Sequence, residues 1–269
     1  WLALALLGFV MAALLPGLRN FKLDASTDAL LLESDKDLRS FRQIQMRYQT
    51  RDFLFIAVVP NNGEVFTPET LGMISDLRDE LTQVAAVKDI ITVLDVPLLS
   101  TVTGRMADLG MNFETLRSHE VKLEVARKEL TTSPLYRNLV ASADGKVGAM
   151  QIFLKDHPSL PRLSNLRDEL LYKRIHGGLS AAQEQELARL RPDYERAKEE
   201  YEASTRVAIA EIRAILARHK GEATLYLGGM PMIIDDMMTF IQSDMATFGG
   251  AVLLFLVAMM GIIFREVRW

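Results

Sequence analysis

The segment that decides the fold is residues 223–264, "ATLYLGGMPMIIDDMMTFIQSDMATFGGAVLLFLVAMMGIIF". It begins with a run rich in β-forming residues at 223–229, passes two glycines and a proline, and ends in a long apolar stretch. The last part, residues 245–264, carries no charge. At about 1.5 Å per helical residue it is roughly 30 Å long, which is the thickness of a bilayer core. We therefore predict a strand that leads into a transmembrane helix.

A second apolar segment lies at residues 1–18, "WLALALLGFVMAALLPGL", and it also carries no charge. A cleaved signal peptide is the alternative interpretation, but its apolar region runs about 7–15 residues behind a basic leader. The chain begins at Trp1 and shows no basic leader. We therefore expect a first transmembrane helix at 1–18 and a chain that is part of a longer protein.

The charges around the second span predict its orientation. Acidic residues precede this span and basic residues follow it: Asp235, Asp236, Asp244, Arg265 and Arg268. The positive-inside bias then places residues 265–269 in the cytoplasm and residues 19–243 on the exoplasmic side. Arg19 and Lys22, just after the first span, weigh against this orientation.

The region between the spans alternates between strand-like and helical patterns. Strands are predicted at residues 52–59, 88–96, 147–155 and 223–229, the third after an Asp-Gly turn at 142–146. One helix is predicted to begin after a cap at Thr67, with Pro68 at its first position, and another at 120–130. A longer helical region is predicted over 162–219 with a break at 176–180. Ser180 caps the helix after the break, with Glu184 near the reciprocal position.

This order of elements is typical of an α+β domain of the split βαβ, or ferredoxin-like, type. A helical hairpin at about 162–200 would enlarge the second crossover, and residues 97–140 could add or reorder strands. The hairpin carries charges of both signs, which favours a solvated helix with ion pairs between side chains four residues apart. A contact arm for a second copy or for an accessory protein is the alternative.

Several classes of chemistry are not supported by the sequence. The chain has no cysteine, and its net charge of −4 leaves no basic face for nucleic acid. The nucleophile elbow and the phosphate-binding glycine loop are both missing. Four scattered histidines form no ligand pair and are expected at the solvated surface: His119, His157, His176 and His219. We therefore expect neither an enzyme nor a cofactor or metal site.

At this point the chain resembles one repeat unit of an RND (resistance–nodulation–division) superfamily exporter, nearest to the MMPL-like branch that includes hopanoid and other lipid exporters. The resemblance covers essentially the whole chain and includes the early segment "STDALLLESDKDLRSFRQIQMRY". Its other residues are Gly228, Gly229, Pro231, Asp235, Asp236, Phe248, Gly249, Phe264, Arg265, Arg268 and Trp269.

The resemblance implies a transporter in a bacterial inner membrane, with the large domain on the periplasmic side. Such exporters use an ion gradient to move lipids or other hydrophobic compounds, and their ion-relay carboxylates lie on later spans. The implied partners are the bilayer, a hydrophobic substrate, the remaining spans and a second porter domain of the same protein. A second copy or a periplasmic accessory protein would be a further partner.

Two other functions stay open. A two-span sensor would bind a signal with its outer domain, and a protein-translocation accessory of the same superfamily would bind unfolded polypeptide.

Within the expected exporter, we predict a coupling junction formed by Gly228, Gly229, Pro231, Asp235 and Asp236. Pro231 would be the first helical residue, and the helix dipole would favour the two carboxylates in about the next turn. They precede the apolar core by roughly 13 Å, outside the bilayer. The two glycines would absorb the dihedral change when the membrane bundle moves.

Overall fold

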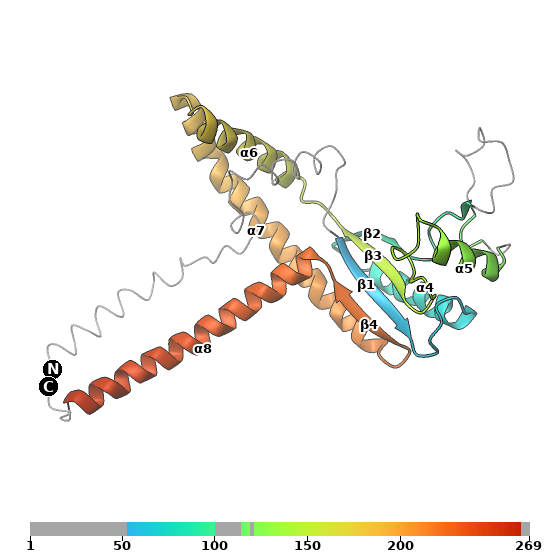
Figure 1. The fold of residues 1–269 in the computed structure, drawn as a ribbon. Coiled ribbons are helices and arrows are strands. Elements are labelled where there is room, and N and C mark those ends of the chain that lie inside the picture. Colours follow the sequence, from blue (N-terminus) through green and yellow to red (C-terminus); the bar gives the residue numbers. More distant parts are fainter. Residues whose placement is uncertain (1–52, 100–113, 119–120, 265–269) are drawn as a thin grey trace. The chain divides into compact units, whose positions relative to one another are not determined.

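The computed structural model describes residues 53–99, 114–118 and 121–264 (Figure 1). The chain divides into two compact units, of which one is Phe41–Met232 and the other combines Trp1–Ser40 with Ile233–Trp269. The predicted first span at 1–18 and the cytoplasmic segment 265–269 lie outside the described residues.

The first unit is built on a four-stranded antiparallel sheet with the order β2-β3-β1-β4. Its strands are β1 Phe53–Pro60, β2 Val87–Ile91, β3 Gly148–Leu154 and β4 Ala223–Gly228. The prediction of a mixed α+β domain is confirmed, and each of the four predicted strands forms.

The second strand is shorter than predicted, because it ends at Ile91 rather than at residue 96. A turn follows it, in which the Asp95 carboxylate accepts hydrogen bonds from the Thr92 amide at 2.9 Å and from the Thr92 hydroxyl at 2.7 Å. A side chain that bonds to backbone nearby in the chain offers the backbone an alternative to strand pairing. The apolar residues Val93 and Leu94 are nevertheless buried in the core.

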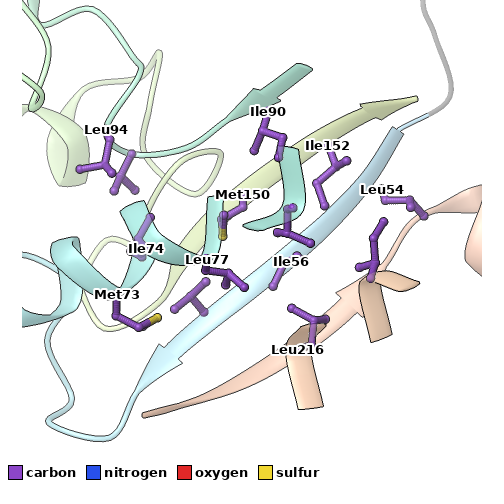
Figure 2. Packing of buried hydrophobic residues seen from close by; sticks show 14 of the residues in the cluster. Leu54, Ile56, Met73, Ile74, Leu77, Ile90, Leu94, Met150, Ile152 and Leu216 are labelled. Carbon is purple, nitrogen blue, oxygen red and sulfur yellow. The ribbon is translucent and has the colours of Figure 1, made fainter. Parts of the chain in front are cut away.

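One face of the sheet carries the hydrophobic core (Figure 2). Ile56 and Met150 lie beside Ile74 and Leu77 of helix α4, which spans Pro68–Thr82, and Leu54 belongs to the same cluster. The last turns of helix α7 (Ala181–Arg218) cover the same face through residues such as Leu216. The start of α4 is confirmed, since the Thr67 hydroxyl accepts from the Thr70 amide at 3.2 Å and Pro68 follows.

The other helices are α5 (Leu123–Thr132), α6 (Leu160–His176) and α8 (Met230–Phe264). The predicted hairpin forms from α6 and the first half of α7, where Leu170, Leu190 and Tyr194 are buried. Helix α7 has 38 residues, so one helix serves both the hairpin and the sheet. Ser180 caps it as predicted, but the reciprocal partner is Gln183 rather than Glu184, because Gln183 occupies the third helical position.

Helix α8 has 35 residues, which at about 1.5 Å per residue makes it roughly 52 Å long. Its segment Met230–Leu256 is the one candidate membrane span found among the described residues, on length and composition. This segment begins earlier than the predicted span of 245–264, although the helix itself continues to Phe264.

Candidate functional site

The predicted coupling junction lies where β4 passes into α8. Strand β4 ends at Gly228 and helix α8 begins at Met230, so one residue, Gly229, joins them. Gly229 has φ +118, a conformation that L side chains rarely adopt. A Cβ at this position would lie 2.5 Å from the carbonyl oxygen of Phe53 and 3.0 Å from the Cα of Leu54. Both the backbone angle and the close approach of β1 therefore require glycine.

Gly228 has a different reason to be glycine. It lies opposite Phe55 in the register of β1 and β4, and a Cβ on it would be 2.6 Å from the Phe55 ring. The aromatic ring thus occupies the space that a side chain would otherwise fill, which is a known way of stabilising a strand glycine. A side chain at either of the two predicted hinge positions would therefore clash with β1.

The five predicted junction residues are divided between the two compact units. Gly228, Gly229 and Pro231 belong to the unit Phe41–Met232, whereas Asp235 and Asp236 belong to the other unit. Because the helix begins at Met230, Pro231 is its second residue rather than its first, and the first turn contains no acidic residue. Since the dipole effect falls off within the first turn, it does not explain the two aspartates as predicted.

Beside the junction, the second face of the sheet carries partly exposed aromatic side chains among the described residues. We call it the aromatic face and define it by residues that share one side of the strands: Phe53, Phe55, Ile91, Phe153 and Tyr226. The side chains of Phe53 and Phe55 are 42% exposed, and that of Tyr226 is 60% exposed. The rings of Phe53 and Phe153 lie across the β1–β3 pair with centroids 6.4 Å apart.

Sequence reasoning missed the aromatic face, although β1 contained a signal for it. In "FLFIAVV" apolar residues occupy both phases of the strand, so that β1 presents apolar side chains to both faces of the sheet. The segment was predicted as a strand from its apolar, β-forming residues, and the helices α4 and α7 cover the face that carries Leu54, Ile56 and Val58.

A polar cluster joins the ends of α4 and α7. The Glu80 carboxylate accepts hydrogen bonds from the Arg218 guanidinium and from Nε2 of His219, the latter at 3.0 Å. These two hydrogen bonds, with Arg218 as the larger cause, lower the pKa of the Glu80 carboxyl below its ordinary value of 4.5. His219 is only 8% exposed, so its predicted position at the solvated surface is wrong. The reason is that it caps α7 where that helix meets α4.

The other histidines show no common site. His157 contacts Glu200 with its Nε2 at 3.1 Å, and His176 is exposed and stacks on Tyr172. His119 lies outside the described residues. Within the part of the chain that the structure describes, no group of three or more His, Asp or Glu is placed to hold a metal ion.

Comparison of the chain with known proteins identified no relative. The chain matches none of the protein-family models and none of the curated proteins with which it was compared.

Proposed function

We propose that this chain is the porter-domain portion of an ion-gradient-driven RND-type transporter that exports lipids or other hydrophobic compounds. The observation that carries the proposal is the direct continuation of β4 through Gly229 into α8, which contains the candidate membrane span. A connection of one residue allows little independent movement of a folded outer domain and a helix in a bilayer. It suits a protein in which movement of the membrane helices must reach the sheet.

The sheet supports the finer part of the proposal. The strand order β2-β3-β1-β4, with α4 after β1 and the α6–α7 hairpin after β3, is the arrangement expected of a split βαβ domain. We infer that α4 and α7 are its two crossover helices and that the hairpin is inserted into the second crossover. Together with a first span at 1–18, this would give the two-span architecture expected of the exporter family.

The aromatic face favours a hydrophobic substrate or an apolar partner domain. An exposed apolar patch that exceeds the usual scatter of surface residues marks an interaction site on many proteins. A two-span sensor is the second candidate function, and a protein-translocation accessory is the third.

The experiment interrupts helix α8 at the boundary between the two compact units, near the start of the candidate membrane span. A Gly-Ser-Gly-Ser insertion between Met232 and Ile233 would break α8 at the boundary between the two compact units. We expect the full-length protein with this insertion to reach the membrane in normal amounts and to lose most of its export of a fluorescent lipid analogue from energised cells. The reason is that a flexible joint cannot transmit the movement of the helix.

The matched control is the same insertion between Gly177 and Gly178, in the connection between α6 and α7. A Cβ on Gly178 would meet nothing within 4 Å, so the insertion has room there. We expect the control to export at the normal rate. Equal export by both insertion variants would refute a coupling role for the junction.

A further inference from the structure

The ring of His219 lies between two carboxylates from distant parts of the chain. Its Nε2 is 3.0 Å from Oε1 of Glu80 in α4, and its Nδ1 is 3.5 Å from Oε1 of Glu222, in the turn that joins α7 to β4. Nδ1 is buried and has no hydrogen-bond partner among the described residues. Buried polar atoms are nearly always hydrogen-bonded, so this nitrogen requires an explanation.

The number of protons on the ring decides which of the two contacts is favourable. A neutral imidazole has one N–H group, so that one nitrogen donates a hydrogen bond and the other presents a lone pair. Neutral His219 that donates to Glu80 turns the lone pair of Nδ1 toward the carboxylate of Glu222. The imidazolium has an N–H group on both nitrogens and can donate to both carboxylates. The arrangement therefore fits the charged ring better than the neutral one.

His157 provides a comparison within the same chain. Its Nε2 is 3.1 Å from Oε2 of Glu200, and its Nδ1 is 3.2 Å from the hydroxyl oxygen of Ser159. Here the neutral ring satisfies both contacts, because Nε2–H donates to the carboxylate and Nδ1 accepts from the hydroxyl. The two histidines thus differ in the group that Nδ1 faces, which is a hydroxyl at His157 and a carboxylate at His219.

The other charged groups near His219 leave one carboxylate facing the ring. The charged groups lie on α4 and on the end of α7 with the turn that follows it: Glu80, Arg218, Lys220 and Glu222. The residue after β1 in this region is the uncharged Asn61, whose side chain donates to the carbonyl of Gly221 at 2.9 Å.

Arg218 and Lys220 oppose a further cation. However, Arg218 bonds to Glu80, and Lys220 is exposed. The ionic contact described for Glu222 is with His219. A proton on this ring therefore supplies the positive charge that Glu222 faces.

We propose that His219 is a proton-binding site, at which the imidazolium joins Glu80 of α4 to Glu222, the residue before β4. Proton uptake converts the unsatisfied Nδ1 into a donor and allows a charge-assisted hydrogen bond to Glu222. It therefore ties the end of α7 and the beginning of β4 to α4. This response to acid is independent of the transport proposed above.

Such a site gives the stability of the domain a definite dependence on pH. An unfolded chain releases the proton of a histidine near pH 6.5, whereas the folded domain would hold it between Glu80 and Glu222. The contribution of the site is therefore complete below about pH 6.5 and is lost as the pH rises. It has the opposite sign to that of the Glu80 carboxyl, whose lowered pKa makes its contribution disappear as the pH falls.

Nitrogen-15 NMR of the chain in lipid nanodiscs, with only the histidines labelled, measures the protonation of each ring. The chain has four histidines, and the signals of His219 are identified by their loss in His219→Asn. At about pH 7 we expect the doubly protonated fraction to be at least about threefold larger for His219 than for His157. A fraction for His219 that does not exceed that for His157 would overturn the proposal.

A pair of substitutions in the turn tests the part played by Glu222. The amide of Glu222→Gln can donate to an unprotonated Nδ1, so we expect the doubly protonated fraction of His219 to fall about threefold, to the level of His157. The Glu222 side chain is 57% exposed, and the substitution therefore leaves the core intact. Lys220→Gln, the matched control, removes an exposed charge from the same turn and should not lower this fraction.

Thermal unfolding between about pH 6 and pH 8 supplies a second measurement. We expect the melting temperature of the unaltered chain to fall more steeply over this range than that of Glu222→Gln, because the variant lacks the proton-dependent contact. Unchanged protonation of His219 in Glu222→Gln, or equal slopes for the two chains, would overturn the proposal.

Discussion

At the scale of single residues, the glycines of the junction show how a local conformation fixes the course of the chain. Gly229 combines a positive φ of +118° with a carbonyl oxygen, that of Phe53, only 2.5 Å from where a Cβ would lie. Its neighbour Gly228 accommodates an aromatic ring from β1. A sequence containing "GG" between a strand and a helix suggests a hinge, but the neighbouring strand determines what each glycine does.

We expect Gly229→Ala to destabilise the domain by more than about 2 kcal/mol, because a strained backbone alone costs about 1–3 kcal/mol and the clash with Phe53 adds to it. The matched control is Gly72→Ala in the middle of α4, where a Cβ would meet nothing within 4 Å. That substitution should stabilise the domain by about 0.5–1 kcal/mol, since alanine is the better helix former. Denaturant unfolding of the two variants measures both effects, and a neutral Gly229→Ala would contradict the packing described.

We expect Glu80 to make the stability of the domain depend on pH, because its folded-state pKa is lowered. Its folded-state pKa is lowered by Arg218 and His219, so its contribution is present above its ordinary value of 4.5 and is lost as the pH falls through the folded value. We expect Glu80→Gln to lower the melting temperature at pH 7 and to have progressively less effect below pH 4.5. The control, Asp79→Asn, removes a carboxylate whose side chain is 71% exposed. A constant effect of Glu80→Gln across this pH range would contradict the assignment.

At the scale of elements, much of the fold could be predicted because apolar residues recur at regular intervals. The strands β1, β3 and β4 and the cap of α4 follow from β-forming runs and from the Thr67–Pro68 pair. The early end of β2 could not be predicted, because it depends on the Asp95 carboxylate bonding back to Thr92. The burial of His219 likewise depends on Glu80, which is 139 residues away in sequence.

The candidate site was predictable only in part. The glycines and the proline of the junction stood out in the sequence, but their contacts with Phe53 and Phe55 come from strand pairing. The aromatic face required knowing which side of the sheet the helices cover. Which strands lie at the edges of the sheet depends on the order of the strands, and no local pattern in β4 shows that it is an edge strand.

The α6–α7 hairpin contains a proline in a helix interior, Pro192 of α7. A proline in a helix interior removes a backbone hydrogen bond and costs about 3 kcal/mol. We expect Pro192→Ala to slow amide hydrogen exchange in the hairpin by more than tenfold, roughly the effect of 1.4 kcal/mol or more, and to leave exchange in the sheet unchanged. Unchanged exchange in the hairpin would show that the proline is accommodated without cost.

At the scale of the whole molecule, the orientation in the membrane is open to a direct test. The turn at 142–146 precedes β3 in the unit Phe41–Met232, and Ala143 in it is exposed. If the domain is exoplasmic, a membrane-impermeant maleimide should label Ala143→Cys in spheroplasts without lysis. Labelling that occurs only after lysis would place the domain in the cytoplasm and contradict the proposed topology.

The central claim is that this domain serves a gradient-driven exporter of hydrophobic compounds. Its most direct test is to reconstitute the full-length protein in liposomes and to follow a fluorescent phospholipid analogue while a proton or sodium gradient is imposed. The account predicts that movement of the analogue accelerates with one of these gradients and stops when an ionophore collapses it. Movement that is no faster with either gradient than in empty liposomes would contradict it.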